Sequence, residues 1–132
     1  MSNDLQNVFE TILGQYESAL ERWYRGDPFG WLELMGEEMT YFSPFMNTLI
    51  DGKSAVETII APIEGQIHSP GFEIVDPKLQ LGEELAVFTL QLNELDEEGT
   101  LNVGWKVTEV YRQVGDKWRL IHSHLSPIAE EQ

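Results

Sequence analysis

The part of the chain that follows Gly65 most constrains the fold, because it is a succession of strand-like segments separated by short turn signals. The segments span about residues 67–81, 84–95, 101–114 and 117–126, and the breaks between them read GEE, LDEEGT and GD. Runs rich in β-branched and aromatic residues that end at glycine and acidic residues are typical of hairpin-linked strands. Strands joined by short turns run in opposite directions, so this half of the chain predicts an antiparallel sheet.

The first half of the chain has a helical pattern instead. Apolar residues recur every three or four positions through residues 4–25, which predicts one long amphipathic helix. Asn3 or Asp4 can cap the start of this helix, and Gly26 can end it.

Two shorter helices and one strand are expected next. Asp27 and Pro28 predict the N-cap and first position of a helix that ends near Met35. The stretch EMTYFSPF predicts a short strand closed by proline, and a helix of about three turns follows the DG turn. Its apolar stripe consists of Val56, Ile59, Ile60 and Ile63. Helices first and hairpin-linked strands second predict an α+β fold, with the helices covering one face of a curved antiparallel sheet.

Composition limits the class of function. The 132 residues have the length of one ordinary domain, so residues 1–132 are expected to form a single domain. Eight Lys plus Arg against 23 Asp plus Glu give a net charge of −15, which argues against nucleic acid and membrane as partners. The absence of cysteine excludes disulfides and thiolate chemistry. Neither a signal peptide nor an apolar run of about 20 residues is evident, and we expect a soluble, cytoplasmic protein.

Four stretches of the sequence resemble a known superfamily: RGDPFGWLELMGEEMTYFSPF, LIDGKSAVE, DPKLQLGEELAVFTLQL and WKVTEVYRQVGDKWRLIHSHLS. With the first helix they cover nearly the whole chain. The last stretch is the most specific, with a Thr-x-Val-aromatic strand, a tight turn, and then Trp-x-hydrophobic-hydrophobic-His-x-His-x-Ser. On these stretches the chain resembles the nuclear transport factor 2-like superfamily in its SnoaL-like branch, and in particular the association domain of calcium/calmodulin-dependent protein kinase II.

The resemblance implies a cone-shaped, cystatin-like α+β fold, with a pocket between the concave sheet and the helices, and usually a dimer. It does not settle the function, because this superfamily includes isomerases, dehydratases, hydrolases, cyclases, transport adaptors and oligomerisation modules on one scaffold.

The turn between the last two strands decides which side chains face that pocket. A two-residue turn at GD would pair Val114 with Lys117 and place Glu109 on the same face as His122 and His124. A one-residue change in this turn moves every later side chain of the last strand to the other face.

A three-residue loop, with Asp116 in the left-handed conformation, would instead pair Gln113 with Lys117. Glu109 then shares its face with Leu125. The kinase association domain resembles this stretch with Asp-Gly in place of GD and has pocket arginines at the positions that match Glu109 and Leu125. Both features favour the three-residue loop.

On the three-residue interpretation, the two faces of the last hairpin differ in role. The concave face holds Trp105, Val107, Glu109, Tyr111, Ile121, Ser123 and Leu125. The opposite face holds Lys106, Thr108, Val110, Arg112, Leu120, His122 and His124. This second face is half apolar, so we expect a homodimer through the surface that carries Val110, Leu120, His122 and His124.

Glu109 is the candidate catalytic residue. A carboxylate in the middle of an apolar strand is costly to bury in its charged form, and burial raises its pKa towards the range of a general base. Tyr111 is its expected hydrogen-bond partner. The structural alternative pairs Glu109 with Arg112, Arg119 or Lys106.

Aromatic residues are the candidate ligand-binding surface, because the helices cannot close the wide end of a cone completely. The candidates are Tyr16, Trp31, Phe42, Phe45, Trp105 and Tyr111, together with Glu109. The alternative is that these aromatic residues form ordinary core. No cofactor is expected, and no metal either, because His122 and His124 supply only two ligands and His68 lies on a different strand.

These observations predict a small dimeric protein that binds a mostly apolar small molecule, with isomerase-like or dehydratase-like acid–base activity through Glu109. Because Glu109 and Leu125 stand where the kinase domain has arginines, a neutral or cationic ligand is favoured over a carboxylate. The alternative function is a non-enzymatic association module.

Overall fold

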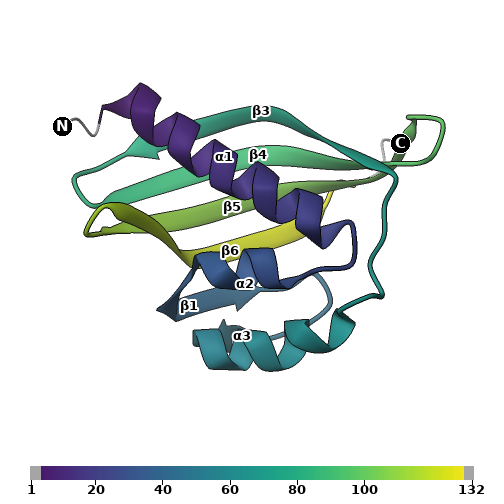
Figure 1. Cartoon of the computed structure of the whole chain (residues 1–132), viewed down its shortest axis with the longest axis horizontal. Helices are drawn as coiled ribbons and strands as arrows, with labels where there is room; N and C mark the ends of the chain where they lie inside the picture. The colour runs from purple at the N-terminus through teal and green to yellow at the C-terminus, as the bar shows by residue number, and fades with distance from the viewer. Residues whose placement is uncertain (1–3, 130–132) are drawn as a thin grey trace.

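The computed structural model describes residues 4–129, in which three α-helices lie on one face of a six-stranded sheet (Figure 1). The helices and the 3-10 turn are α1 (Leu5–Trp23), α2 (Phe29–Leu34), α3 (Lys53–Ile60) and η1 (Ala61–Ile63). The strands are β1 (Met35–Phe42), β2 (Ile50–Asp51), β3 (Gly71–Leu81), β4 (Leu85–Leu95), β5 (Leu101–Val114) and β6 (Lys117–Pro127). Within this part of the chain, no helix combines the length and apolarity that crossing a membrane requires.

Helix α1 crosses the sheet diagonally and buries one stripe against it. Its N-cap is Asp4, whose side chain accepts a hydrogen bond from the backbone N–H of Asn7 at 2.8 Å. The other candidate cap, Asn3, lies outside the described residues. The buried stripe consists of Val8, Ile12, Tyr16, Ala19 and Leu20. The apolar spacing of the sequence therefore predicted both this helix and its buried face.

Charged side chains fasten the two N-terminal helices together. Arg22 of α1 pairs with Asp27 at 2.7 Å and with Glu33 of α2 at 2.9 Å. Asp27 also accepts the backbone N–H of Phe29 at 3.0 Å, which satisfies a donor at the start of α2. These contacts fix α2 over the sheet, and they hold the pKa of Asp27 and of Glu33 below their usual values through the Arg22 guanidinium.

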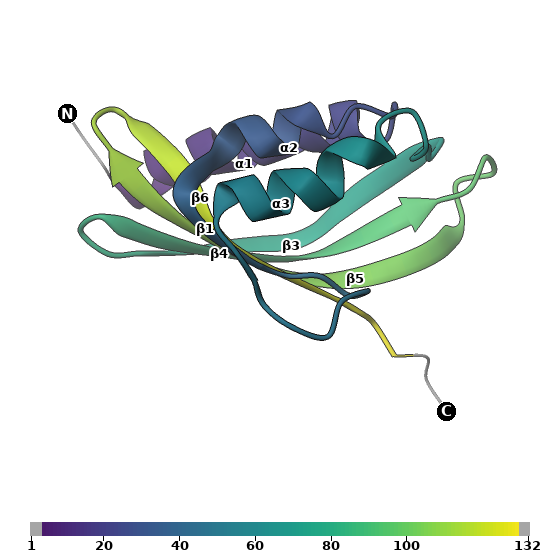
Figure 2. The same cartoon turned by 90° about the horizontal axis from the view of Figure 1, so that it is seen from below.

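The sheet has the strand order β2-β1-β6-β5-β4-β3. Seen from below, it curves beneath the helices, and its far face carries none of them (Figure 2). All neighbouring strands are antiparallel except β1 and β6, which pair in parallel. The predicted α+β fold and the four C-terminal strands are confirmed. The parallel pair was not predicted, because β1 and β6 are far apart in the sequence and no local signal joins them.

The turn between β5 and β6 has two residues rather than the three that we expected. Val114 pairs with Lys117, and Gly115 takes a φ of 64°, which is the left-handed conformation that glycine adopts at little cost. Asp116 has no positive φ, in contrast to the expected loop. Glycine at the first central position is typical of a type II′ hairpin, whose twist suits the flanking strands.

A bulge in the same hairpin restores the predicted orientation of Glu109. The register shifts between Val110, which pairs with His122, and Tyr111, which pairs with Leu120. The extra residue on β6 returns Glu109 to a position opposite Ser123. The assignment of Glu109 to the concave face is therefore right, although the reason given by the turn was wrong.

The bulge also corrects the predicted position of Leu120. This residue was expected on the far face of the sheet, but it is 0% exposed and pairs with Tyr111 and with Met35 beneath the helices. Ile121, expected on the concave face, lies at the bulge and is half-buried. Leu120 is therefore part of the core and cannot belong to an interface on the far face.

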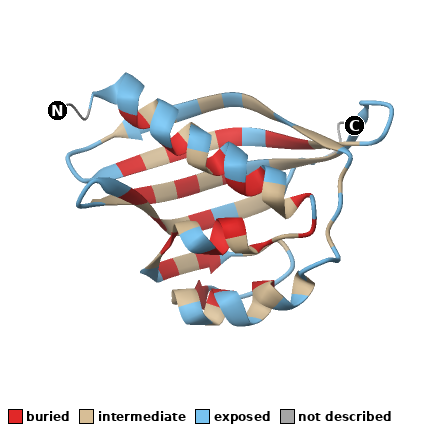
Figure 3. Ribbon diagram, in the orientation of Figure 1, coloured by how far each residue is buried: buried red, intermediate tan, exposed pale blue. Residues whose placement is uncertain are grey.

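The core lies between the helices and the concave face of the sheet (Figure 3). Burial alternates along the central strands, as expected for a sheet covered on one side. The buried side chains at its centre are Ile12, Met39, Phe88, Tyr111 and Leu120.

Candidate ligand cavity and its buried carboxylate

A cavity of about 470 Å³ lies between the helices and the concave sheet. Its wall is mainly aromatic and aliphatic, with side chains from all three α-helices and from strands β1, β4, β5 and β6. Among residues 4–129, Glu94 and Glu109 are the only acidic residues that line it, and no lysine, arginine or histidine of this range does so. Such a volume is typical of sites for small molecules.

Glu109 lies in this wall and is 1% exposed. Its carboxylate accepts three hydrogen bonds: Tyr111 Oη donates to Oε1 at 2.6 Å, while Trp31 Nε1 and Ser123 Oγ donate to Oε2 at 3.2 and 3.0 Å. The three donors come from α2, β5 and β6, so the tertiary structure assembles them. No cation pairs with Glu109 among the described residues, so the expected structural alternative, pairing with Arg112, Arg119 or Lys106, does not occur.

Burial raises the pKa of Glu109 above its usual value of 4.5, and the hydrogen bonds from Tyr111, Trp31 and Ser123 oppose that rise. Glu109 in turn acts on the nearby phenols. The pKa of Tyr16 is raised well above its usual value, and that of Tyr41 is raised to about 12. Burial is the largest cause in both cases, and the charge of the Glu109 carboxylate adds to it. The site therefore combines one carboxyl of raised proton affinity with phenols that keep their protons at neutral pH.

Glu94 is the second carboxylate of the wall, and the sequence analysis did not single it out. Tyr24 Oη and Trp105 Nε1 both donate to its Oε2, at 2.8 and 3.0 Å. Tyr24 lies just after α1, 70 positions before Glu94 in the sequence, so the fold brings this donor to the carboxylate. The alternation along β4 could have placed Glu94 on the buried face, since it shares that face with Phe88, Leu90 and Leu92.

The structure brings five of the predicted site residues together. Tyr16, Trp31, Phe45, Trp105 and Glu109 all line the cavity. Phe45 is 83% exposed, which places it where the cavity meets solvent. Trp31 contacts Tyr41 edge-to-face with ring centroids 5.0 Å apart, so the aromatic wall is packed rather than loose.

Tyr111 and Phe42 do not line the cavity. Tyr111 is 0% exposed and packs against Phe88, so it acts on the cavity only through its hydrogen bond to Glu109. The prediction that Phe42 lines the cavity was wrong. Side chains alternate along a strand, and because Tyr41 points inward, its neighbour Phe42 points to the far face of the sheet.

On that far face the ring of Phe42 contacts both histidine rings. Its centroid lies 5.8 Å from that of His122 and 5.2 Å from that of His124. His122 Nδ1 lies 2.9 Å from Thr40 Oγ1, and burial, followed by the neighbouring His124, lowers the pKa of His122. Over residues 4–129, no group of three or more histidine and acidic side chains is arranged to hold a metal ion. The two histidines are thus part of a packed aromatic surface.

The fold and the cavity define a cone-shaped α+β protein of the nuclear transport factor 2-like type, and sequence comparison agrees. The sequence model of the SnoaL-like domain matches residues 16–130, and the chain belongs to this family. Among curated proteins, no sequence matches the chain.

Solved structures show the same fold. A protein from Parabacteroides distasonis, described as a "putative ketosteroid isomerase", is 27% identical, with a TM-score of 0.81 over 97% of this chain and 95% of its own. A protein of the nuclear transport factor 2-like family from Streptomyces avermitilis is 20% identical, with a TM-score of 0.78 over 96% and 100%. The association domain of calcium/calmodulin-dependent protein kinase II from C. elegans is 20% identical, with a TM-score of 0.72 over 92% and 96%. The predicted superfamily and the similarity to the kinase domain are confirmed.

Proposed function

We propose that the cavity binds a small, mostly apolar molecule and that Glu109 acts on it as a general base. One observation carries the proposal: a carboxylate with no cationic partner among the described residues lies in the wall of a cavity of about 470 Å³ that is lined mainly by apolar groups. A structural carboxylate would be expected to have a cation, whereas a base that removes a proton from a bound molecule needs raised proton affinity and an apolar surrounding. The isomerase description of the Parabacteroides protein supports this class of chemistry.

The experiment uses a neutral bicyclic ketone, 1-decalone, as the probe. Binding is measured by calorimetry, and exchange of the hydrogen next to the ketone is followed by NMR in D2O. We expect protein-dependent exchange that falls at least tenfold in Glu109→Gln while binding is retained, because the isosteric amide keeps the shape of the wall but cannot accept the proton.

Glu97→Gln is the matched control, because Glu97 is exposed and its substitution removes the same charge outside the cavity. This variant should keep the exchange rate of the unmodified protein. Equal exchange rates in the Glu109→Gln variant and the unmodified protein would show that the carboxylate has no role as a base.

The second candidate function, a non-enzymatic association module, would be expected to have a filled or featureless pocket and an assembly larger than a dimer. The cavity favours ligand binding over this alternative. For the assembly we propose a homodimer through the far face of the sheet, where Val110, His122 and His124 lie together with Phe42.

A further inference from the structure

Glu94 lines the cavity, and one of its carboxylate oxygens has no hydrogen-bond donor among residues 4–129. Both of its donors, Tyr24 and Trp105, bind the same oxygen, Oε2. Within residues 4–129, Oε1 accepts no hydrogen bond, and no buried side-chain oxygen in this range lacks a partner. Oε1 is therefore at least partly exposed, on a residue that lines the cavity. Tyr24 and Trp105 therefore fix the orientation of the carboxylate and leave half of it available to a ligand.

From this geometry we infer that the bound molecule is an apolar amine, whose protonated nitrogen binds Glu94 Oε1 while its hydrocarbon part fills the cavity. The inference rests on the proposed function, since it names the class of molecule that the same cavity takes. It adds a binding residue, Glu94, to the general base Glu109.

The charged groups of the cavity wall favour a ligand with a positive charge. Among the described residues, the two carboxylates are the only charged groups of the wall, and the whole chain carries a net charge of −15. An anionic ligand would be repelled, and a neutral apolar ligand would remove water from Glu94 without replacing the lost interaction. An ammonium group compensates that loss with a charge-assisted hydrogen bond.

The aromatic rings near Glu94 suit the same group. Phe45 and Trp105 meet edge-to-face with centroids 6.1 Å apart, and both line the cavity. The faces of such rings attract an alkylammonium ion through their quadrupole, most strongly for tryptophan. Trp105 donates its N–H to Glu94, so its ring is held beside the carboxylate that would bind the nitrogen.

Glu109 is less suited to hold the amine. Both of its oxygens already accept hydrogen bonds from protein donors, and its side chain is 1% exposed. Glu94 is half-buried and has one oxygen free of such donors among the described residues. The two carboxylates therefore differ in role, with Glu94 binding the ligand and Glu109 acting on it.

The test compares three probes with one hydrocarbon cage: 1-adamantanemethylamine, 1-adamantanemethanol and 1-adamantanecarboxylate. Calorimetry at pH 7.5 should show that the alcohol binds, that the amine binds at least tenfold more tightly, and that the carboxylate binds most weakly. Glu94→Gln should remove the tenfold preference for the amine and leave the affinity for the alcohol within twofold. Glu97→Gln removes the same charge from an exposed loop and should keep the preference.

The outcomes separate this inference from the proposed function. If the alcohol binds and the amine binds no more tightly, the amine inference is wrong and the apolar cavity stands. A preference that survives Glu94→Gln but disappears in Glu109→Gln also overturns it, because the nitrogen would then bind the other carboxylate. If none of the three probes binds at millimolar concentration, both the inference and the proposed function fail.

Discussion

At the scale of single residues, the balance at Glu109 is between the cost of burying its charge and the three hydrogen bonds that stabilise that charge. Burial is the larger effect, since the pKa of Glu109 lies above its usual value despite donors from Trp31, Tyr111 and Ser123. Above pH 4.5, the buried carboxyl is therefore expected to cost folding free energy that a neutral amide would not.

This balance predicts a pH-dependent effect of Glu109→Gln on stability. At pH values between 4.5 and the raised pKa, the folded protein holds a proton that the unfolded chain has lost, so the stability of the unmodified protein falls as pH rises through this window. The amide of the Glu109→Gln variant does not titrate in this range, so the variant does not lose stability in this way. Urea unfolding at pH 5, 6, 7 and 8 should show that the free energy of unfolding of the variant increases relative to that of the unmodified protein as pH rises.

Glu97→Gln, which removes an exposed charge, should show no such trend. If the free energy of unfolding of the unmodified protein instead rose with pH relative to that of Glu109→Gln, the balance described above would be wrong. The ionised carboxylate would then be net stabilising in its buried position.

At the scale of elements, the β5–β6 hairpin shows how two local features decide one orientation. The two-residue turn at Gly115 would by itself place Glu109 with the histidines, and the bulge at Ile121 reverses that outcome.

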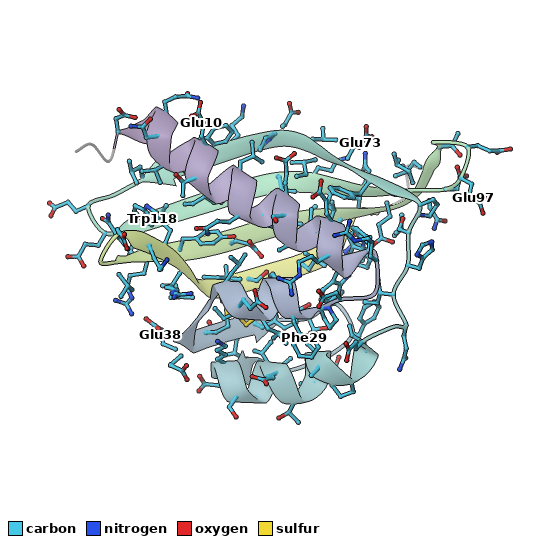
Figure 4. All side chains as sticks on the ribbon, viewed as in Figure 1. Glu10, Phe29, Glu38, Glu73, Glu97 and Trp118 are labelled. Carbon is cyan, nitrogen blue, oxygen red and sulfur yellow. The ribbon has the colours of Figure 1, made fainter. Side chains whose placement is uncertain are left out.

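The exposed loop that carries Glu97 follows β4. It lies at the end of the sheet opposite to the end that carries Trp118 (Figure 4).

The bulge predicts an unequal effect of two neighbouring substitutions. Leu120→Ala should lower the free energy of unfolding by about 2–5 kcal/mol, because Leu120 is 0% exposed and its removal leaves a cavity. Ile121→Ala should cost about 1 kcal/mol or less, because this residue is only half-buried. Denaturant titration of both variants measures the difference.

The three-residue loop expected from the sequence would give the reverse order, with Ile121 beneath the helices and Leu120 on the far face. A larger loss for Ile121→Ala than for Leu120→Ala would therefore show that the bulge is wrongly placed.

At the scale of the whole molecule, the uncovered face of the sheet is the surface available for a second copy. Val110 and His122 are half-buried there, and Phe42 remains 41% exposed although it packs on both histidines. An aromatic and aliphatic surface in the middle of a sheet suits a two-fold interface, in which each residue meets the same patch of its partner.

The proposed dimer predicts that Val110→Glu shifts the protein to a monomer. A carboxylate at the centre of the interface would meet its own copy or be buried without a cation, which weakens association. Light scattering coupled to size exclusion measures the mass, and circular dichroism checks that the variant is folded. Leu101→Glu, at an exposed position at the start of β5, is the control and should remain a dimer.

An unmodified protein that is monomeric at micromolar concentration would contradict the proposed dimer. So would a Val110→Glu variant that keeps the mass of the unmodified protein, because the interface would then lie elsewhere.

The helices, the four long strands and the superfamily could all be predicted from the amino-acid sequence. Apolar spacing, the cap at Asp4 and the turn residues act over a few neighbouring positions, and such signals can be read along the chain. The inward orientation of Glu109 was expected from the assumed loop and from the resemblance to the kinase domain. Trp105 and Tyr16 were candidates for the wall because helices cannot close the wide end of a cone.

The pairing of distant segments could not be predicted from the sequence and is visible only in the folded chain. The bulge at Ile121, the parallel pairing of β1 with β6, the outward position of Phe42 and the meeting of Glu94 with Tyr24 all depend on contacts between residues far apart in the sequence. Their energies arise from packing and hydrogen bonds formed only when the helices close over the sheet, and no local pattern records them. The cavity is of the same kind, since it is the space that those contacts leave unfilled.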